Sequence, residues 1–255
     1  MLVDSHCHID FPELADKLDS VFDLMRENRV EAALCVSVTL EDFPRVRGLA
    51  ESYPNVYASV GIHPDYEGVA PVSVAELVAL AEHPKIVAIG ETGLDYYRLK
   101  GDLEWQRERF RTHIRAAREC KKPLIIHTRE AAQDTLRIMR EEGAEKAGGV
   151  MHCFTETLDV AKAAMDLGFY ISFSGIVTFK NAKSIKGVAR EVPLANLLVE
   201  TDSPYLAPVP YRGRTNQPGY VKHVAEEIAL LKEIDFSQVC VETTKSFYKL
   251  FNIIR

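Results

Sequence analysis

Two histidines separated by a single residue stand near the start of the chain, in the run LVDSHCH at residues 2–8. Successive side chains of a β-strand point to opposite faces, so His6 and His8 would project to one face and Cys7 to the other. Two imidazoles on one face can bind a metal ion. The alternative is an ordinary pair of polar residues at a strand end, because a short motif is only a hypothesis until the rest of the chain supports it.

Five further side chains that could bind a metal or move a proton follow other apolar runs. They are His63 in GIHP, Glu91 in AIGETGLDYY, His127 in LIIHTRE, His152 in VMHCF and Asp202 in VETDSPYL. Any one of these is more often structural than catalytic. Together with His6 and His8 they make seven positions, each at the carboxyl end of a predicted strand, and that set favours a functional site.

Short apolar runs alternate with helical patterns along the whole chain. Strands are predicted over 2–6, 33–38, 56–61, 86–91, 123–128, 149–154, 169–174 and 197–202. Apolar residues recur at helical spacing between them, as in Leu14, Leu18, Val21, Phe22 and Met25, and in Trp105, Phe110, Ile114 and Ala117. Ser73 and Glu76 have the spacing of a capping box, and two more helical patterns cover 218–233 and 237–251.

This alternation predicts an α/β fold with a parallel sheet, because each crossover helix returns the chain to begin the next strand in the same direction. Eight such units in about 250 residues are the usual size of a closed TIM (β/α)₈ barrel, whose active site lies at the C-terminal ends of the strands. An open doubly wound sheet is the alternative, but it would normally show a Gly-rich phosphate loop after its first strand. We expect one domain over 1–255.

Composition limits the classes of function. The chain is 47% hydrophobic and carries a formal net charge of −6, from 31 basic and 37 acidic residues. That balance argues against a broad positive surface for gripping duplex DNA. No apolar run is long enough to span a membrane, and we expect a cytoplasmic protein without membrane partners.

The cysteines do not suggest disulfides or a cysteine-type zinc site. There are five, an odd number, and none forms a C-x-x-C pair. Cys7 and Cys153 each follow a candidate ligand by one residue, so we expect both thiols to face away from the site as small core residues.

The candidate ligands outnumber those that one ion needs. His6, His8, Glu91, His127, His152 and Asp202 are six, whereas a tetrahedral zinc takes three or four. Six ligands suggest two divalent ions that share Glu91, about 3.5–4 Å apart, which could polarise an ester or phosphoryl oxygen and activate a water. Imidazole and carboxylate ligands suit Zn, Mn, Mg, Ni and Fe to differing degrees, so the metal stays open.

The motifs DSHCH, GIHP, GETGLDYY, IIHTRE, MHCF and VETDSPYLAP together resemble the TatD family of metal-dependent hydrolases and deoxyribonucleases, and look closest to its YcfH-type members. The resemblance implies a TIM barrel, a two-metal site and 3′–5′ exonuclease or related phosphodiesterase activity on DNA. It also implies that one ion is held by His6, His8, Glu91 and Asp202, the other by Glu91, His127 and His152, and that His63 contacts the substrate phosphate. The last loop often reads N-E-P in the family but is Asn216-Gln217-Pro218 here, which removes a charge beside the mouth.

The alternation of strand side chains also predicts a layer beneath the metals. Asp4 lies two residues before His6, and Glu200 lies two before Asp202, so both should point into the barrel. There they could accept hydrogen bonds from the ligating imidazoles. We expect Asp202 itself to be both ligand and general base, and Glu91 to be the second catalytic residue. The alternative for Asp202 is a cap of the turn before Ser203-Pro204.

Aromatic and basic residues are interleaved in two loops after predicted strands. Candidate substrate-binding residues are Tyr96, Arg98, Arg129, Tyr211 and Arg212, with Tyr97, Lys100 and Arg214 nearby. Such a rim could stack unpaired bases and contact phosphates, which suits a single-stranded DNA end. A solvated charged loop is the competing interpretation for Arg98, and a structural ion pair is the competing one for Arg129.

Three classes of function follow, and we favour a phosphodiesterase acting on DNA ends, as a monomer. A small-molecule amidohydrolase on the same barrel is the second, but many of those bridge their metals with a modified lysine, and this strand end offers Glu91 instead. A variant of that class would cleave the ester of an aminoacyl-tRNA. The third is a non-catalytic metal-binding scaffold, which would have no need for Asp202 beside two ions.

Overall fold

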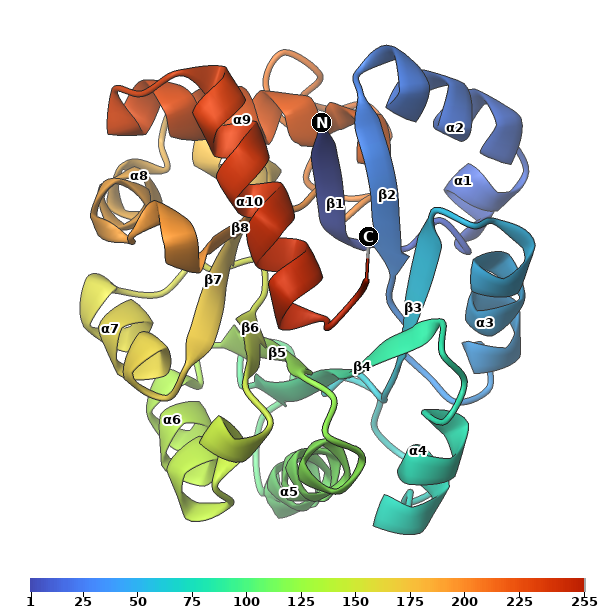
Figure 1. Ribbon diagram of the computed structural model, residues 1–255. Helices are drawn as coiled ribbons and strands as arrows, with labels where there is room; N and C mark the ends of the chain where they lie inside the picture. The colour runs from blue at the N-terminus through green and yellow to red at the C-terminus, as the bar shows by residue number, and fades with distance from the viewer. Residues whose placement is uncertain (255) are drawn as a thin grey trace.

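The computed structural model describes residues 1–254 and shows eight parallel strands in consecutive order around one barrel (Figure 1). The strands are β1 Leu2–Cys7, β2 Val30–Cys35, β3 Val56–Val60, β4 Ile86–Asp95, β5 Leu124–Arg129, β6 Gly149–Met151, β7 Phe169–Phe173 and β8 Leu197–Val199. Backbone bonds from His8 N to Ser203 O at 2.8 Å and from Asp202 N to His6 O at 2.9 Å join the first strand to the segment after the last. The predicted TIM barrel is therefore confirmed.

Ten α-helices within the described residues surround the strands. They are α1 Pro12–Ala15, α2 Leu18–Glu27, α3 Phe43–Ser52, α4 Val74–Leu80, α5 Glu104–Cys120, α6 Ala132–Glu141, α7 Leu158–Asp166, α8 Lys183–Glu191, α9 Val221–Lys232 and α10 Phe236–Leu250. Ser73 caps α4, since its hydroxyl accepts the Glu76 N–H at 3.2 Å, as predicted. No helix within residues 1–254 has both the length and the apolar character needed to cross a membrane.

Strand boundaries differ from the prediction where the site lies. β4 continues four residues past Glu91, because Thr92–Asp95 pair with Ile126–Arg129 of β5. The pairing is irregular between Ile89 and Thr92, so Glu91 sits at a break in the register rather than at the strand end. Gly93 has a φ of 134°, and a Cβ there would collide with the carbonyl oxygen of His127, so only glycine lets β4 run this close to β5.

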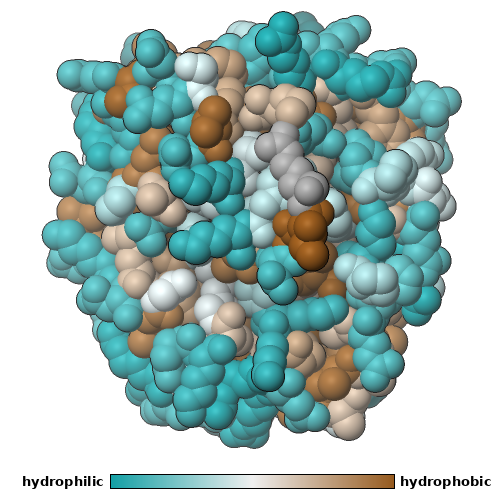
Figure 2. All heavy atoms as spheres, viewed as in Figure 1, coloured by the Kyte–Doolittle hydropathy of each residue, from teal (hydrophilic) through white to brown (hydrophobic). Residues whose placement is uncertain are grey.

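The core has two layers. Inside the barrel, Phe247 from α10 and Phe251, which follows that helix, pack with Val3, Leu34, Val87, Ile125, Val150, Tyr170 and Leu198. A second cluster fills the space between strands and helices. The helix α10 crosses the front of the barrel in Figure 1, at the end where the strands begin. Figure 2 shows that this face is mostly hydrophilic, with separate apolar patches.

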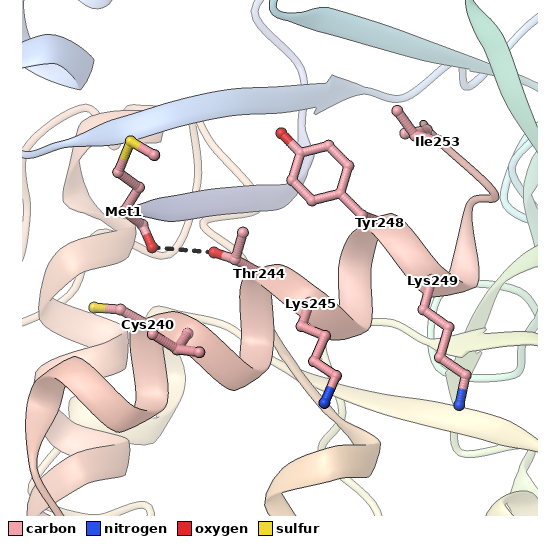
Figure 3. A pocket seen from close by; sticks show the side chains of 8 residues that line it. Met1, Cys240, Thr244, Lys245, Tyr248, Lys249 and Ile253 are labelled. Carbon is pink, nitrogen blue, oxygen red and sulfur yellow. Dashed lines mark hydrogen bonds between the residues drawn. The ribbon is translucent and has the colours of Figure 1, made fainter. Parts of the chain in front are cut away.

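A cavity of about 480 Å³ lies beside α10 on that face, and Figure 3 shows the Thr244 hydroxyl donating to the Met1 carbonyl across it, at 3.1 Å. Its lining includes the basic side chains of Lys245 and Lys249. Residues of the predicted site are absent from its lining, so the chemistry belongs at the opposite end of the barrel, where the strands finish.

His113 is a fully buried histidine on the inner face of α5. Its Nδ1–H donates to the Arg109 carbonyl at 2.8 Å, and its Nε2 accepts the Ile62 N–H at 3.1 Å. Burial disfavours the charged imidazole and lowers the pKa of His113 to about 4. The folded protein therefore keeps this side chain neutral at pH values where an unfolded chain would protonate it.

We expect His113 to make the protein sensitive to acid. An unfolded histidine takes up its proton near pH 6.5, so stability is lost as the pH falls from there toward the folded value of about 4. The two pKa values correspond to a loss of about 2 kcal/mol between pH 7 and pH 5. His113→Asn should remove this part of the pH dependence in urea unfolding, although the variant is less stable at pH 7. His83→Asn is the control, and an unchanged pH slope in His113→Asn would contradict the assignment.

Candidate metal centre

A cavity of about 460 Å³ opens at the carboxyl ends of the strands. Its lining includes six of the seven predicted histidines and carboxylates, which are His8, His63, Glu91, His127, His152 and Asp202. His6 is fully buried, and its ring stacks on that of His152 with centroids 4.0 Å apart. The barrel thus brings together all seven side chains from residues far apart in the sequence.

Glu91 is the centre of the cluster, and its side chain is almost fully buried. Its Oε2 atom lies 3.4 Å from His6 Nε2. Its Oε1 atom faces three other imidazoles: His63 Nε2 at 3.3 Å, His127 Nδ1 at 3.2 Å and His152 Nε2 at 2.8 Å. The two oxygens of one carboxylate therefore point to two different groups of histidines.

Asp202 completes the group around His6. Its Oδ1 atom lies 3.6 Å from the Nε2 atoms of both His6 and His8, and those two nitrogens are 3.2 Å apart. Asp202 has a φ of 55°, in the left-handed region, and its carbonyl accepts the Tyr205 N–H at 3.1 Å. The backbone of Asp202 thus closes the turn while its carboxylate points into the cavity, so the capping role and the site role are both present.

The charges of the cluster support one another. Burial alone would raise the pKa of Glu91, but the neighbouring His152 and His63 imidazoles hold it well below its ordinary value. Burial likewise opposes protonation of His63, yet Glu91 and Asp65 raise the pKa of His63 to about 9. Asp202 also has a lowered pKa despite its burial, because His8 and His6 stabilise its anion. Both central carboxylates are therefore ionised at neutral pH.

These donors fit divalent cations. Three overlapping groups each bring their ligand atoms within 4.8 Å of one another: His6 with His152 and Asp202, His6 with His8 and Glu91, and His63 with Glu91 and His127. The Nε2 atoms of His6 and His8 lie 3.2 Å apart, and both lie 3.6 Å from Asp202 Oδ1. Imidazole and carboxylate donors converging in a buried pocket are the set that Zn²⁺ and related ions take.

Outer partners orient most of these imidazoles. His8 Nδ1 donates to the Val36 carbonyl at 2.9 Å, and His152 Nδ1 lies 3.2 Å from Glu200 Oε1. Glu200 also accepts the Cys153 N–H at 2.7 Å, so it lies where the alternation of β8 placed it. Such partners set the tautomer and direction of a ligating imidazole.

Asp4 is a correction to the sequence prediction. Its carboxylate accepts the Thr201 N–H at 2.8 Å and the Thr201 hydroxyl at 2.5 Å, and it contacts no imidazole. Asp4 shares the outward parity of Leu2, which packs in the outer core layer, whereas Val3 packs inside the barrel. The register shift between Asp4 and Cys7 breaks the alternation, which explains why Asp4 does not share the face of His6. Through its bonds to Thr201, Asp4 instead joins β1 to the segment after β8.

Cys153 is a second correction, because it lines the cavity instead of facing away. β6 ends at Met151, and Cys153 has a left-handed φ of 41°, so strand alternation no longer applies there. Its Sγ atom lies 3.2 Å from the Ser174 hydroxyl. Cys7 does face away, and its thiol donates to the Leu34 carbonyl.

The predicted substrate-binding residues divide into two groups. His63, Arg98 and Arg129 line the cavity. Arg98 pairs with Asp65 at 2.6 Å, and the Arg129 guanidinium lies 3.8 Å from the centroid of the Tyr97 ring. These placements leave cationic groups beside the imidazole cluster, where a phosphate could reach them.

Tyr96, Tyr211 and Arg212 are not among the residues that line the cavity. The Tyr96 hydroxyl donates to Asp134 at 2.7 Å on α6. The Tyr211 ring stacks on Tyr220 with centroids 4.0 Å apart, and the Arg212 guanidinium lies 3.6 Å above the Phe179 ring. Each side chain is thus engaged in a contact outside the cavity lining.

Sequence reasoning missed Asp95, Asp65, Phe11 and Tyr205, which all line the cavity. Asp95 Oδ2 lies 3.0 Å from His127 Nε2, and burial is outweighed by His127 and two backbone N–H groups, which lower the pKa of Asp95 to about 2. A longer β4 would have predicted Asp95, because residues 91, 93 and 95 alternate onto one face. The aromatic residues lie in loops and left no comparable signal.

Comparisons with known proteins agree with this architecture. The family profile described as "TatD related DNase" matches residues 3–252. The uncharacterized metal-dependent hydrolase YcfH of Escherichia coli strain K12 is 48% identical over 99% of this chain and 96% of its own. YabD of Bacillus subtilis strain 168, also an uncharacterized metal-dependent hydrolase, is 43% identical over 99% of this chain and 100% of its own.

A solved structure shows the same fold. The crystal structure of YjjV, a TatD homolog from Escherichia coli K12, superposes with a TM-score of 0.92 at 29% identity and covers 99% of this chain and 98% of that one. The match extends over the full barrel, as does the family profile, and the two relatives are similar at nearly full length. The chain therefore belongs to the TatD family of metal-dependent hydrolases.

Proposed function

We propose that the protein is a deoxyribonuclease that uses two divalent ions to cleave phosphodiester bonds from single-stranded 3′ ends of DNA. The observation that carries the two-ion part is the geometry of Glu91. Its Oε2 faces His6, and its Oε1 faces His63, His127 and His152. A carboxylate whose two oxygens serve two groups of donors is suited to bridge two ions.

The remaining donors divide between these two sides. His6, His8, Asp202 and Glu91 would hold one ion, and Glu91, His127 and His152 would hold the other. Bound divalent ions would supply Lewis-acid polarisation of the scissile phosphate. His63 lines the cavity beside Glu91 Oε1, where its imidazole can contact the substrate phosphate.

Asp202 is the residue we assign to proton transfer. It is ionised, it lines the cavity and 18% of its side chain surface is exposed, so an attacking water can reach its carboxylate. His8 and His6 hold that carboxylate in place through Oδ1. A carboxylate fixed beside the reacting water can accept its proton during attack on phosphorus.

The cavity walls support a nucleotide chain end as substrate. Phe11 stacks on His8 with centroids 4.8 Å apart, and Tyr205, which is 55% exposed, stands edge-on to Phe11. Arg98 and Arg129 line the same cavity. Aromatic faces can stack unpaired bases, and guanidinium groups can contact the phosphates that follow.

We expect faster cleavage of single-stranded ends than of blunt duplex ends. The net charge of −6 argues against a broad positive surface for gripping duplex DNA, so the salt dependence should correspond to about two or three phosphate contacts. Digestion of matched single-stranded and duplex oligonucleotides with Mn²⁺ over a salt series measures both. Arg129→Ala should raise the KM and reduce the salt dependence, whereas Arg137→Ala on the outer side of α6 is the matched control.

Equal rates on both forms would contradict the preference for single strands. Hydrolysis of an aminoacyl-tRNA ester or a small amide without cleavage of DNA would instead favour the amidohydrolase-like alternative. Metal binding without hydrolysis of any of these substrates would favour a scaffold.

A further inference from the structure

Gln106 on α5 is a fully buried polar side chain that bonds to two separate backbone segments. Its Oε1 accepts the Asp95 N–H at 2.9 Å. Its Nε2 donates to the Pro64 carbonyl at 2.9 Å and lies 3.4 Å from the Asp95 carbonyl. The amide therefore joins the end of β4 to the segment after β3, with a donor on one side and an acceptor on the other.

His113 lies seven residues, or two helical turns, after Gln106 and so faces the same side of α5. Its Nε2 accepts the Ile62 N–H, and its Nδ1–H is held by the Arg109 carbonyl. Ile62 and Pro64 are the two residues that flank His63. Two side chains of α5 therefore hold the backbone on both sides of that histidine.

Gln106 is also connected to His127, through Asp95. Gln106 bonds to the backbone of Asp95, and the Asp95 carboxylate lies 3.0 Å from His127 Nε2. His63 and His127 both face Glu91 Oε1, at 3.3 and 3.2 Å. The contacts of α5 thus support His63 and His127, which face Glu91 Oε1. His6 and His8 come instead from β1 and the loop that follows it.

We infer that Gln106 and His113 are positioning residues that set the placement of His63 and His127 around Glu91 Oε1. A buried amide or imidazole is costly unless its hydrogen bonds are made. An apolar side chain would be enough for packing alone. Phe110, which lies between the two on the same face of α5 and is fully buried, is an example. The polar side chains of Gln106 and His113 instead pair with backbone N–H and carbonyl groups of Asp95, Pro64 and Ile62.

The inference rests on the proposed two-ion site, and its test separates the two ideas. Gln106→Met keeps the volume but removes all three contacts. Phe110→Leu is the matched control, because it loosens the same helix face without touching the site. Metal-free protein is titrated calorimetrically with Mn²⁺, and the imidazole ¹⁵N resonances of assigned histidines are recorded without metal.

We expect Gln106→Met to weaken, by about 10–100-fold, the binding of the ion proposed at Glu91, His127 and His152, as changes in outer-shell partners do. The affinity for the ion proposed at His6, His8, Glu91 and Asp202 should stay unchanged. Without metal, the His63 and His127 resonances should shift while those of His6 and His8 stay. Phe110→Leu should lower the melting temperature without either effect. If Gln106→Met does not fold, Gln106→Glu replaces it, since an ionised carboxylate can still accept the Asp95 N–H but has no proton to donate to the Pro64 carbonyl.

Unchanged resonances with unchanged binding would overturn the inference. So would equal weakening of both ions, or the same selective change in Phe110→Leu. If wild-type protein binds two ions but cleaves no DNA, the proposed function fails and this inference stands. If wild-type protein binds fewer than two ions, the metal-free resonances decide it alone.

Discussion

Asp202→Asn should reduce hydrolysis by about 10²–10⁴-fold, the usual contribution of a general base. An amide has nearly the same shape as the carboxylate but cannot accept a proton from water at neutral pH. Asparagine also tolerates the left-handed φ of 55° at this position, so the turn to Tyr205 should persist. The measurement is single-turnover cleavage of an end-labelled single-stranded oligonucleotide, with each of several divalent ions in excess.

The Asn variant needs a check on metal content, because Asp202 Oδ1 also lies 3.6 Å from two imidazoles of the cluster. An excess of metal restores occupancy if the loss is only in affinity, and then a slow rate reports the missing base. Asp134→Asn on α6 is a control carboxylate outside the cavity. Full activity of Asp202→Asn with every ion tested would remove Asp202 from the reaction.

Glu91→Gln should have a comparably large effect, but through the loss of metal. The substitution takes the shared negative charge from between two groups of imidazoles, so protein dialysed after loading should retain one ion or none where the wild type retains two. Affinity should fall by more than the roughly 10–100-fold typical of an outer-shell change. Elemental analysis after loading with Mn²⁺ or Zn²⁺ measures the count, and the hydrolysis rate should fall with it.

Glu200→Gln provides a graded comparison. Glu200 contacts His152 Nδ1 and the Cys153 N–H rather than the open cavity, so the variant should keep both ions with moderately weaker affinity. The affinity for metal should therefore be lowest in Glu91→Gln, intermediate in Glu200→Gln and highest in the wild type. A wild-type protein that never binds more than one ion under excess metal would refute the dinuclear arrangement.

The fold could be predicted from the sequence because its signals are local. Each strand is a short apolar run and each helix has an apolar stripe, and a parallel order follows from their alternation. The same local period put His6 and His8 on one face and turned Glu200 inward beside His152. It failed for Asp4, because β1 shifts register before Cys7. It also failed for Cys153, because the backbone turns left-handed after β6.

The candidate site shows the same division. The seven histidines and carboxylates were predictable, since parallel strands of a barrel must end at one mouth. The contacts of Tyr96, Tyr211 and Arg212 were not predictable, because a loop side chain takes whichever partner the fold brings near, here Asp134, Tyr220 and Phe179.

The sequence alone thus determined the barrel, the end of the barrel that carries the site, and the kinds of ligand side chain at that end. Only the tertiary structure decided which oxygen of Glu91 faces which histidines, that Asp95 supports His127, and that Gln106 and His113 of α5 hold the segments around His63. The physical reason is range. Side-chain alternation acts between neighbours in the chain, whereas these contacts join residues that only the closed barrel and its helices place side by side.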